Sequence, residues 1–537
     1  MSEAVIMHID ILMALLLVAS AVAAAVKWVR LPYSIALVIV GLVIGVFHIL
    51  PTVEMTPELI LVVFLPALLF EASWNLEITA LRRNWLPISV LSTLGVVVSM
   101  AVIAALLHYC AGVPVDAALL FGAMISATDP ISVLALFKKM GIDKRLSLVL
   151  EGESLFNDGT AVVLFRLILA ATLARASLSV TQMVGNFFVV VLGGIVIGII
   201  VGYAASRITR YFDDHLLEIT LTGIVAYGSY LLAEQAHVSP VIAVVCAGIV
   251  LGNYGSRTAM SATTRLAVNS FWEYAAFVVN SLVFLLIGMQ VKMDLLVKYA
   301  PLIGMGIVGI LLARIAVVYG LCPLLSSKTA PLPWSWRHLL FWGALRGSLS
   351  MALALSLPTS FPMREAIIIV TFGVVLFTLL AQGLTIEPLV RFMGMAVIHS
   401  RLKQYQAYKS ALIAEGVALH SLNTLLASNY ITPRAHARLK EVSVKRQEEL
   451  LKLIDELHIT DASIEELEVL QTRKHLLEVK KDCLVRLVRE GVVSDEVVEE
   501  LKAELDRELQ DLADGGITEA EERPVTSAPT QEDQQQE

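Results

Sequence analysis

The sequence is poor in charge, and this shortage already excludes several classes of protein. Only 16 % of its 537 residues are charged, against about 25 % in an average soluble protein. A soluble domain of this size needs a more polar surface, and a disordered chain holds fewer apolar residues. With 57 % hydrophobic residues, the composition excludes an ordinary soluble enzyme and predicts a polytopic membrane protein.

Cysteines, basic clusters and hydrolytic motifs are also scarce. The four cysteines are far apart in the sequence, which argues against a disulfide framework or a zinc site. No basic cluster indicates nucleic-acid binding, and no HExxH motif indicates a hydrolase. The lack of a P-loop fits transport driven by ion gradients alone. We therefore expect no enzyme activity, no cofactor and no nucleic-acid partner.

Thirteen apolar segments have about the length that crosses the hydrocarbon core of a bilayer. The N-terminus lacks the features of a signal peptide, so we expect the first segment to be retained as a span. The thirteen segments are 9–27, 33–49, 57–73, 86–108, 115–137, 147–173, 183–205, 215–234, 238–254, 270–290, 301–323, 337–357 and 365–390.

The loops between these segments divide unevenly in charge. If the N-terminus is outside, the odd-numbered loops hold 14 Lys and Arg, counting Lys27 and Arg337 at the adjoining segment ends, and the even-numbered loops hold 4. This bias fits the positive-inside rule. We expect a multi-pass plasma-membrane protein with its N-terminus outside and its C-terminal region in the cytoplasm, with an organellar membrane as the alternative.

The densest group of polar residues at membrane depth is the stretch EGESLFND, residues 151–158. Glu153 and Asn157 share one helix face, and Ser154 and Asp158 share the adjacent face, because each pair is four residues apart. A carboxylate in a low dielectric holds a proton or a small cation, and this competition is the physical basis of cation/proton exchange. The alternative is that these groups only pair with internal arginines.

Two spans carry signals for an interruption. Asp129 precedes Pro130, and proline removes a backbone donor and disfavours helical geometry in the residue before it. Gly343, Arg346 and Gly347 interrupt the twelfth apolar run. Because the fifth and twelfth segments are seven apart, they predict inverted repeats with helices broken at the depth where transporters hold ions. A simple proline kink is the alternative for the fifth segment.

The internal arginines need anions, since arginine stays protonated. Arg346 at one interruption is expected to pair with Asp129 at the other, and Arg314 with Glu153. This arrangement leaves Asp158 as the carboxylate without a fixed cation, and therefore as the best candidate for an ion-binding group.

Several stretches together resemble the sodium/proton exchangers of the cation:proton antiporter superfamily, in the NhaP/NHE branch. They are ATDPISVLALF (127–137), EGESLFNDGTAVVLF (151–165), FWEYAAFVVNSLVFLLIG (271–288), LLARIAVVYG (311–320) and GALRGSLSMALAL (343–355), with LPYSIALVIVGLVIG (31–45) and FLPALLFEASW (64–74). The resemblance covers about residues 10–392.

The resemblance implies an all-α transmembrane domain over residues 1–395, with thirteen helices in two inverted six-helix repeats around a linking helix. It implies an elevator-like motion of a core against a dimerisation domain, and a homodimer. The core takes residues 86–173 and 301–390, and the dimerisation domain takes residues 9–73 and 183–290.

The resemblance also assigns roles to the polar residues. It implies that Asp158 binds cation and proton alternately and that Ser154 and Thr128 help to coordinate Na⁺, with Asn157 and Glu153 in the same ion- and proton-binding set. Asn157, standing where other members have Asp, implies electroneutral exchange. The pairs Glu153–Arg314 and Asp129–Arg346 are expected to be structural, although Glu153 also lies in the polar strip, and Glu71 is expected to lie along an access funnel.

Residues after Arg391 differ from the rest in composition. Residues 391–537 hold 19 Lys and Arg against 28 Asp and Glu, whereas residues 1–390 hold 21 against 20. We expect a helical cytoplasmic domain over 396–514, broken at Pro433 and at 491–494, and a disordered acidic tail over 515–537. The helical domain is expected to regulate transport through a ligand or partner. The alternatives are that it stabilises a dimer or that its charged residues form a plain solvated face.

The function expected from these features is a secondary antiporter that exchanges Na⁺ or Li⁺ for H⁺, with membrane lipid and a second copy of the chain as partners. K⁺/H⁺ exchange on the same scaffold is the first alternative, because one sequence does not reveal selectivity. A transport-inactive membrane sensor signalling through its C-terminal domain is the second.

Overall fold

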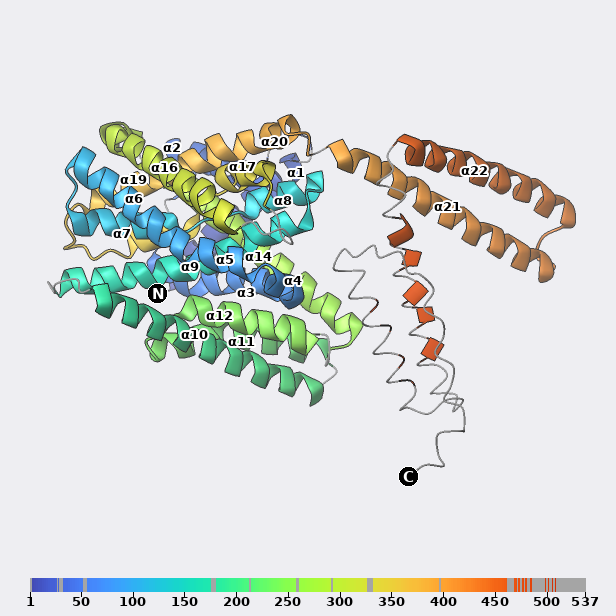
Figure 1. Ribbon diagram of the computed structural model, residues 1–537, viewed down its shortest axis with the longest axis horizontal. Helices are drawn as coiled ribbons and strands as arrows, with labels where there is room; N and C mark the ends of the chain where they lie inside the picture. Colours follow the sequence, from blue (N-terminus) through green and yellow to red (C-terminus); the bar gives the residue numbers. More distant parts are fainter. Residues whose placement is uncertain are drawn as a thin grey trace, which may run out of the picture. The chain divides into compact units, whose positions relative to one another are not determined.

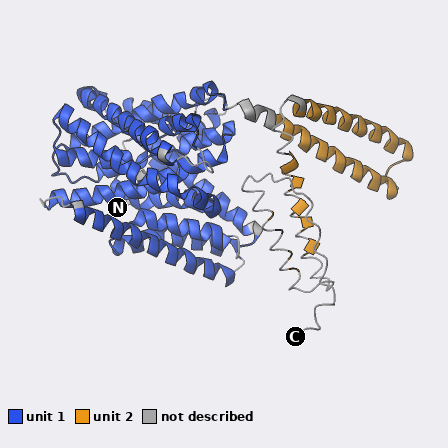
Figure 2. Cartoon of the chain, viewed as in Figure 1, with its two compact units in different colours: residues 1–397 blue, residues 398–537 orange. Residues whose placement is uncertain are grey.

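The computed structural model describes two compact units, residues 1–397 and 398–537 (Figures 1 and 2). All regular structure in the described residues is helical. The described residues are 2–26, 28, 32–51, 56–174, 180–211, 214–256, 260–290, 293–325, 332–395, 397–460 and scattered positions between 468 and 508.

Every segment expected to span the membrane falls on one helix or on two or three consecutive helices in the first unit. These elements are α1 (Ser2–Val26), α2 (Tyr33–Val46), η1 (Leu59–Phe64), α3 (Leu65–Asn75), α4 (Ile78–Arg83), α5 (Trp85–Ser92), α6 (Leu94–Ala111), α7 (Val115–Ser126), α8 (Ile131–Met140), α9 (Lys144–Leu173), α10 (Val180–Ile208), η2 (Thr209–Tyr211), α11 (His215–Gln235), α12 (Pro240–Val250), η3 (Leu251–Gly255), α14 (Ala262–Met289), α15 (Met293–Lys298), α16 (Ala300–Leu325), α17 (Trp334–Trp342), α18 (Ser348–Leu355), α19 (Arg364–Phe377), η4 (Thr378–Gln382) and α20 (Gly383–Phe392).

Nine helices in the described part of the chain are long and apolar enough to cross a membrane. Four shorter apolar segments accompany them, over 10–26, 33–46, 59–75 and 240–255. One of the nine, Gln404–Ala427, belongs to the second unit, and no residue of its most apolar 18-residue stretch is buried.

The helices of the first unit pack in two groups (Figure 1). In one group α10, α11 and α12 pack on one another, α12 packs on α3, and α14 packs on α2 and α3. In the other group α6 packs on α7 and α16, while α19 packs on α16 and α18. Helix α9 contacts α5 and α7 of the second group and also α10 and α12 of the first. It therefore lies at the boundary between the two groups.

The contact between α2 and α14 is close because glycines face backbone across it. A Cβ atom on Gly41 would lie 2.2 Å from the Leu285 carbonyl oxygen, and one on Gly288 would lie 2.3 Å from that of Val38. Small residues let membrane helices approach closely, and the short distance between α2 and α14 requires glycine at these positions.

Both predicted interruptions are confirmed. Helix α7 ends at Ser126 and α8 begins at Ile131, while α17 ends at Trp342 and α18 begins at Ser348. The two irregular segments meet, since the Asp129 amide donates to the Leu345 carbonyl over 2.8 Å. Four half-helix ends are thereby brought to one place inside the first unit.

The second unit contains α21 (Val397–Ala427) and α22 (Pro433–Thr460). The predicted break at Pro433 is confirmed, because α22 begins with that proline, which fits the first turn of a helix. Tyr405 and Ile454 are buried between the two helices. The break predicted at 491–494 and the tail predicted over 515–537 lie outside the described residues.

Candidate ion-binding site

Helix α9 supplies the polar strip predicted over residues 151–158. The helix runs without a break from Lys144 to Leu173, and Asp143 caps its start by accepting from the Arg145 amide over 2.7 Å. Glu153, Ser154 and Asn157 are buried, while Asp158 is partly exposed. The spacing predicted from the sequence therefore places all four side chains on one side of a regular helix.

Asp158 faces a cavity of about 250 Å³ at the meeting point of the broken helices. Its Oδ1 atom is buried and has no hydrogen-bond partner among the described residues. The oxygen-bearing side chains around the same cavity are Glu71, Thr128, Asp129, Glu151, Ser154, Ser348 and Ser350. A buried carboxylate oxygen without a partner is costly unless it binds something.

Thr128, in the interruption between α7 and α8, is held by two residues of α9. The Asn157 Nδ2 atom donates to the Thr128 hydroxyl over 2.7 Å, and the Ser154 hydroxyl donates to the Thr128 carbonyl. The Thr128 amide donates in turn to Asn157 Oδ1 over 3.4 Å. The irregular backbone is therefore fixed against the helix that carries Asp158, with lone pairs on both hydroxyl oxygens left for a further ligand.

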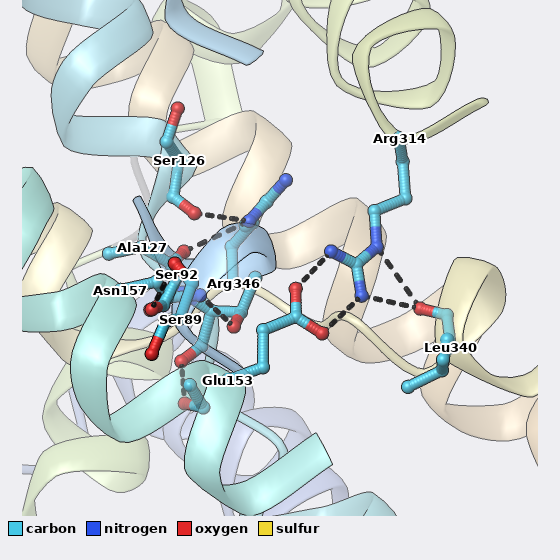
Figure 3. Close-up of polar contacts among 11 residues, drawn as sticks. Ser89, Ser92, Ser126, Ala127, Glu153, Asn157, Arg314, Leu340 and Arg346 are labelled. Carbon is cyan, nitrogen blue, oxygen red and sulfur yellow. Dashed lines mark hydrogen bonds and ion pairs between the residues drawn. The ribbon is translucent and has the colours of Figure 1, made fainter. Parts of the chain in front are cut away.

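The ion pair expected between Glu153 and Arg314 is formed (Figure 3). Arg314 donates to both oxygens of the carboxylate, one contact from Nη2 measuring 3.1 Å. It also donates from Nε and Nη2 to the Leu340 carbonyl in α17, over 3.1 and 2.8 Å. Glu153 is 1 % exposed and Arg314 6 %, so the bidentate pair is inside the protein. Each charge is compensated by the other.

The expected ion pair between Asp129 and Arg346 is wrong. Arg346 Nη1 donates instead to the carbonyls of Ser126 and Ala127, over 2.9 and 3.1 Å (Figure 3). Asp129 Oδ1 accepts from the Ile131 amide over 3.1 Å. No ion pair joins the two residues, both of which the structure describes.

Half-helix ends explain this difference. The carbonyls at the end of α7 carry partial negative charge and attract the Arg346 guanidinium, whereas the amides at the start of α8 attract the Asp129 carboxylate. The same carboxylate lies against Gly347 at the start of α18, where a Cβ would stand 2.3 Å from Asp129 Oδ2. Each charge thus neutralises freed backbone groups of the interruptions rather than the other charge.

Comparisons with known proteins show the family of this chain. The profile of a family described as "Sodium/hydrogen exchanger, transmembrane" matches residues 13–392. The chain belongs to the sodium/hydrogen exchanger family. The Na⁺/H⁺ antiporter ApNhaP of Aphanothece halophytica is 40 % identical to it over 471 residues, 87 % of this chain and 90 % of that protein. The antiporter NhaG of Bacillus atrophaeus is 39 % identical over 502 residues, 90 % of this chain and 94 % of that one.

A solved structure shares the fold of this exchanger. The sodium proton antiporter MjNhaP1 from Methanocaldococcus jannaschii superposes with a TM-score of 0.58 at 22 % identity. The match covers 71 % of this chain and 99 % of that one. At this identity the likeness concerns the fold and carries no statement about individual site residues.

Three contacts of the exchanger's site residues were not predicted. The Arg346 amide donates to the Thr378 hydroxyl in η4 over 3.1 Å, and the Ser350 hydroxyl donates to the Met124 carbonyl over 2.9 Å. Ser34 in α2 is hydrogen-bonded to Ser132 in α8. In the sequence each of these contacts is indicated only by a single hydroxyl residue in an apolar run. This signal is weak, because such hydroxyls usually bond to the backbone of their own helix.

Glu71, predicted to lie along an access funnel, lines the same cavity as Asp158. Its Oε1 atom accepts from Asn75 Nδ2 over 2.9 Å within α3. Glu151, one helical turn before Ser154 on α9, also lines the cavity. The side of the cavity toward the start of α9 is therefore acidic, which suits the approach of a cation.

Proposed function

We propose that this exchanger is a secondary active antiporter that moves Na⁺ or Li⁺ in exchange for H⁺, with cation and proton competing for Asp158. The observation that carries the proposal is the buried Asp158 Oδ1 atom, which has no partner among the described residues and faces a cavity. The relatives named Na⁺/H⁺ antiporters support the same reading.

The oxygens near Asp158 form a coherent cation site. The Thr128 and Ser154 hydroxyls line the cavity with it, and irregular backbone with free oxygens is a usual place for Na⁺ in transporters. Asn157 positions Thr128 rather than binding the ion itself, because its amide is used in that hydrogen bond. A cation or a proton neutralises the carboxylate, and each excludes the other.

One carboxylate that alternates between one Na⁺ and one H⁺ makes the exchange electroneutral. Asn157 is neutral and Glu153 is already held by Arg314, so neither adds a second titrating charge in this proposal. The expected result is a rate of proton movement that does not change when a K⁺ gradient and valinomycin set the membrane potential. A rate that follows the potential would contradict it.

The architecture that we propose has thirteen crossings in two inverted repeats. The eight long spans of the first unit, the four shorter ones and the α17–α18 pair give this number. Residues 1–395 form the transport domain, in which the core moves as an elevator against the dimerisation helices, and Glu71 lies on the access path. We place the N-terminus outside the plasma membrane, the regulatory domain of residues 396–514 in the cytoplasm, and two chains in a homodimer.

The test is proton flux in proteoliposomes at zero membrane potential, with wild type compared with Asp158→Asn. Addition of Na⁺ or Li⁺ is expected to move protons in wild type and to leave the variant at the background of empty vesicles. The K⁺ trace in the same preparation decides between Na⁺ and K⁺ exchange. Silence of folded wild type over pH 6–9, in the full chain and after truncation behind residue 400, would favour the sensor and sink the proposal.

A further inference from the structure

Helix α9 has different surroundings on the two sides of Asp158. Toward Lys144, its residues Glu151, Ser154, Leu155 and Asp158 line the cavity. No residue of α9 after Asp158 lines it. The cavity therefore reaches Asp158 from the Lys144 end of the helix, and what lies beyond Asp158 closes the other end.

Directly beyond Asp158, α9 is in tight apolar contact with α12. A Cβ atom on Gly159 would lie 2.6 Å from Ile242 Cγ1, and Ile242 is buried. Such a contact leaves no path along this face of the helix while α9 and α12 stay together. It is apolar, so nothing in it has a directional bond that fixes the two helices in register.

A directional bond is found farther along the same helix. Arg166 Nη1 lies 3.1 and 2.9 Å from the two carboxylate oxygens of Glu234 in α11. Arg166 follows Asp158 by eight residues, about 12 Å along the helix axis. The two side chains are 42 % and 44 % exposed, so the pair lies at the surface of this end and is not part of the buried interior.

The position of Glu234 in α11 supports a role outside its own helix. It is the second-to-last residue of α11, and a carboxylate near a helix C-terminus meets the negative end of the helix dipole. The positive charge of Arg166 from α9 offsets this unfavourable position. The pair also joins two groups of helices, because α11 packs on α10 and α12, whereas α9 packs on α5 and α7 as well.

We propose that Arg166 and Glu234 form a latch that holds α9 against α11 while Asp158 is open to the Lys144 end. The inference rests on the proposed alternating-access exchange, in which the Gly159–Ile242 contact and this ion pair must both separate before Asp158 faces the opposite side. Neither residue binds the transported ion. Arg166 and Glu234 are positioning residues that set the balance between the two orientations.

Breaking the latch shifts this balance, and the shift is measurable from the two sides of the membrane. In vesicles of defined orientation, Arg166→Gln and Glu234→Gln are each expected to raise the apparent KM for Na⁺ at the Lys144 end and to lower it at the opposite end. An exposed ion pair is worth at most about 1 kcal/mol, so the change is about two- to five-fold. The charge-swapped double variant Arg166→Glu with Glu234→Arg is expected to return both values toward wild type.

The chain offers a matched control. Arg391, which is exposed, and Glu387, which is partly exposed, form an ion pair within the single helix α20, with Nη2 2.8 Å from Oε1. Arg391→Gln removes the same chemistry without joining two helices, so both KM values are expected to stay as in wild type. Equal losses from both sides in the Arg166 and Glu234 variants, or a charge swap that restores nothing, would overturn the latch.

A second measurement is independent of transport. In a chain whose four cysteines are replaced by serine, Ile242→Cys reports whether the closed contact opens to a membrane-impermeant maleimide added at the Arg166 end. Labelling is expected to be about two- to five-fold faster with Arg166→Gln than without it. Labelling at the wild-type rate in Arg166→Gln would contradict the latch. If wild type transports nothing but Arg166→Gln is labelled faster, the proposed exchange is wrong and the latch is still supported.

Discussion

Two carboxylates five residues apart on α9 lie in the same membrane-embedded helix and have opposite surroundings. Glu153 is enclosed by Arg314, which also holds the Leu340 carbonyl. Asp158 faces a cavity with one buried oxygen that has no partner in the described part of the chain. Burial of a charge therefore does not by itself mark a functional group. A functional group is marked instead by a buried polar atom that has no hydrogen-bond partner.

The largest effect on stability is expected at Glu153. Glu153→Gln leaves the buried Arg314 guanidinium without its counter-charge, and removal of one partner of a buried pair costs about 3–5 kcal/mol. Thermal unfolding in detergent is expected to show a large loss, with a matching fall in the yield of folded protein. A variant as stable as wild type would mean that the Leu340 carbonyl alone satisfies the arginine.

The control for this loss replaces both partners. Glu153→Leu combined with Arg314→Leu removes both charges, and apolar replacements of buried ion pairs are often neutral or stabilising. The double variant is expected to unfold near the wild-type temperature. If it is as unstable as Glu153→Gln, packing around the pair matters more than its charges.

An intermediate effect is expected at Thr128, which links the broken helix to α9. Thr128→Val keeps the shape of the side chain but removes the hydroxyl that accepts from Asn157 Nδ2, leaving a buried amide unsatisfied at a cost of about 1–3 kcal/mol. Because Thr128 lines the same cavity as Asp158, the KM for Na⁺ is expected to rise several-fold. Thr128→Ser keeps the hydroxyl and is expected to behave almost like wild type in both assays.

A smaller effect on stability is expected at Asp158 itself. Asp158→Asn removes a charge that no described group binds, so the free energy of unfolding is expected to stay within about 1 kcal/mol of wild type or to increase. The small change in stability distinguishes Asp158→Asn from Glu153→Gln, although Asp158→Asn is expected to abolish exchange. A loss as large as that of Glu153→Gln would show that Asp158 is structural and end the comparison.

The smallest effect is expected for an ion pair of the second unit. Lys409 Nζ lies 2.9 Å from Glu468 Oε1 in the second unit, with both side chains partly exposed. Partial burial acts to raise the pKa of Glu468, but the hydrogen bonds from Lys409 and Tyr405 and the charges of Lys409 and His458 together outweigh it and hold this pKa below its ordinary value. Glu468→Gln is therefore expected to cost less than about 1 kcal/mol at neutral pH.

The pH dependence of this small effect has a defined sign. Because the folded pKa of Glu468 is depressed, its contribution is present above the unfolded value of about 4.3 and is lost as the pH falls through the folded value. Amide exchange of α21 and α22 in the full chain is expected to differ between wild type and Glu468→Gln at pH 7 and to converge once the pH falls below the depressed folded pKa of Glu468. A difference that persists in acid would point to packing instead of charge.

Local signals predicted the helices and the breaks, because they depend on nearby residues. Apolar runs located the spans, and Pro130 and the glycines around Arg346 located the interruptions. The Glu153–Arg314 pair was also predictable, since each charge has few alternatives inside a membrane. These inferences needed no knowledge of which helices touch.

The partners of Arg346 and Asp129 were not predictable in the same way. Pairing charge with charge assumes that side chains are the only partners, whereas each interruption frees backbone carbonyls and amides that compete for them. Which ends meet depends on packing of distant segments, such as the Asp129 amide on the Leu345 carbonyl. For the same reason, the Arg166–Glu234 contact between α9 and α11 gave no sign in the sequence.

The unbroken course of α9 has a mechanical consequence. Its 30 residues make a rod about 45 Å long, whereas the α7–α8 and α17–α18 pairs at the site are interrupted. A rod without a hinge cannot take up displacement internally, so a tilt at one end moves the whole length as a lever. Any event that loads or unloads Asp158 and displaces α9 is then felt at both ends of the rod together, with no intervening joint to absorb the movement.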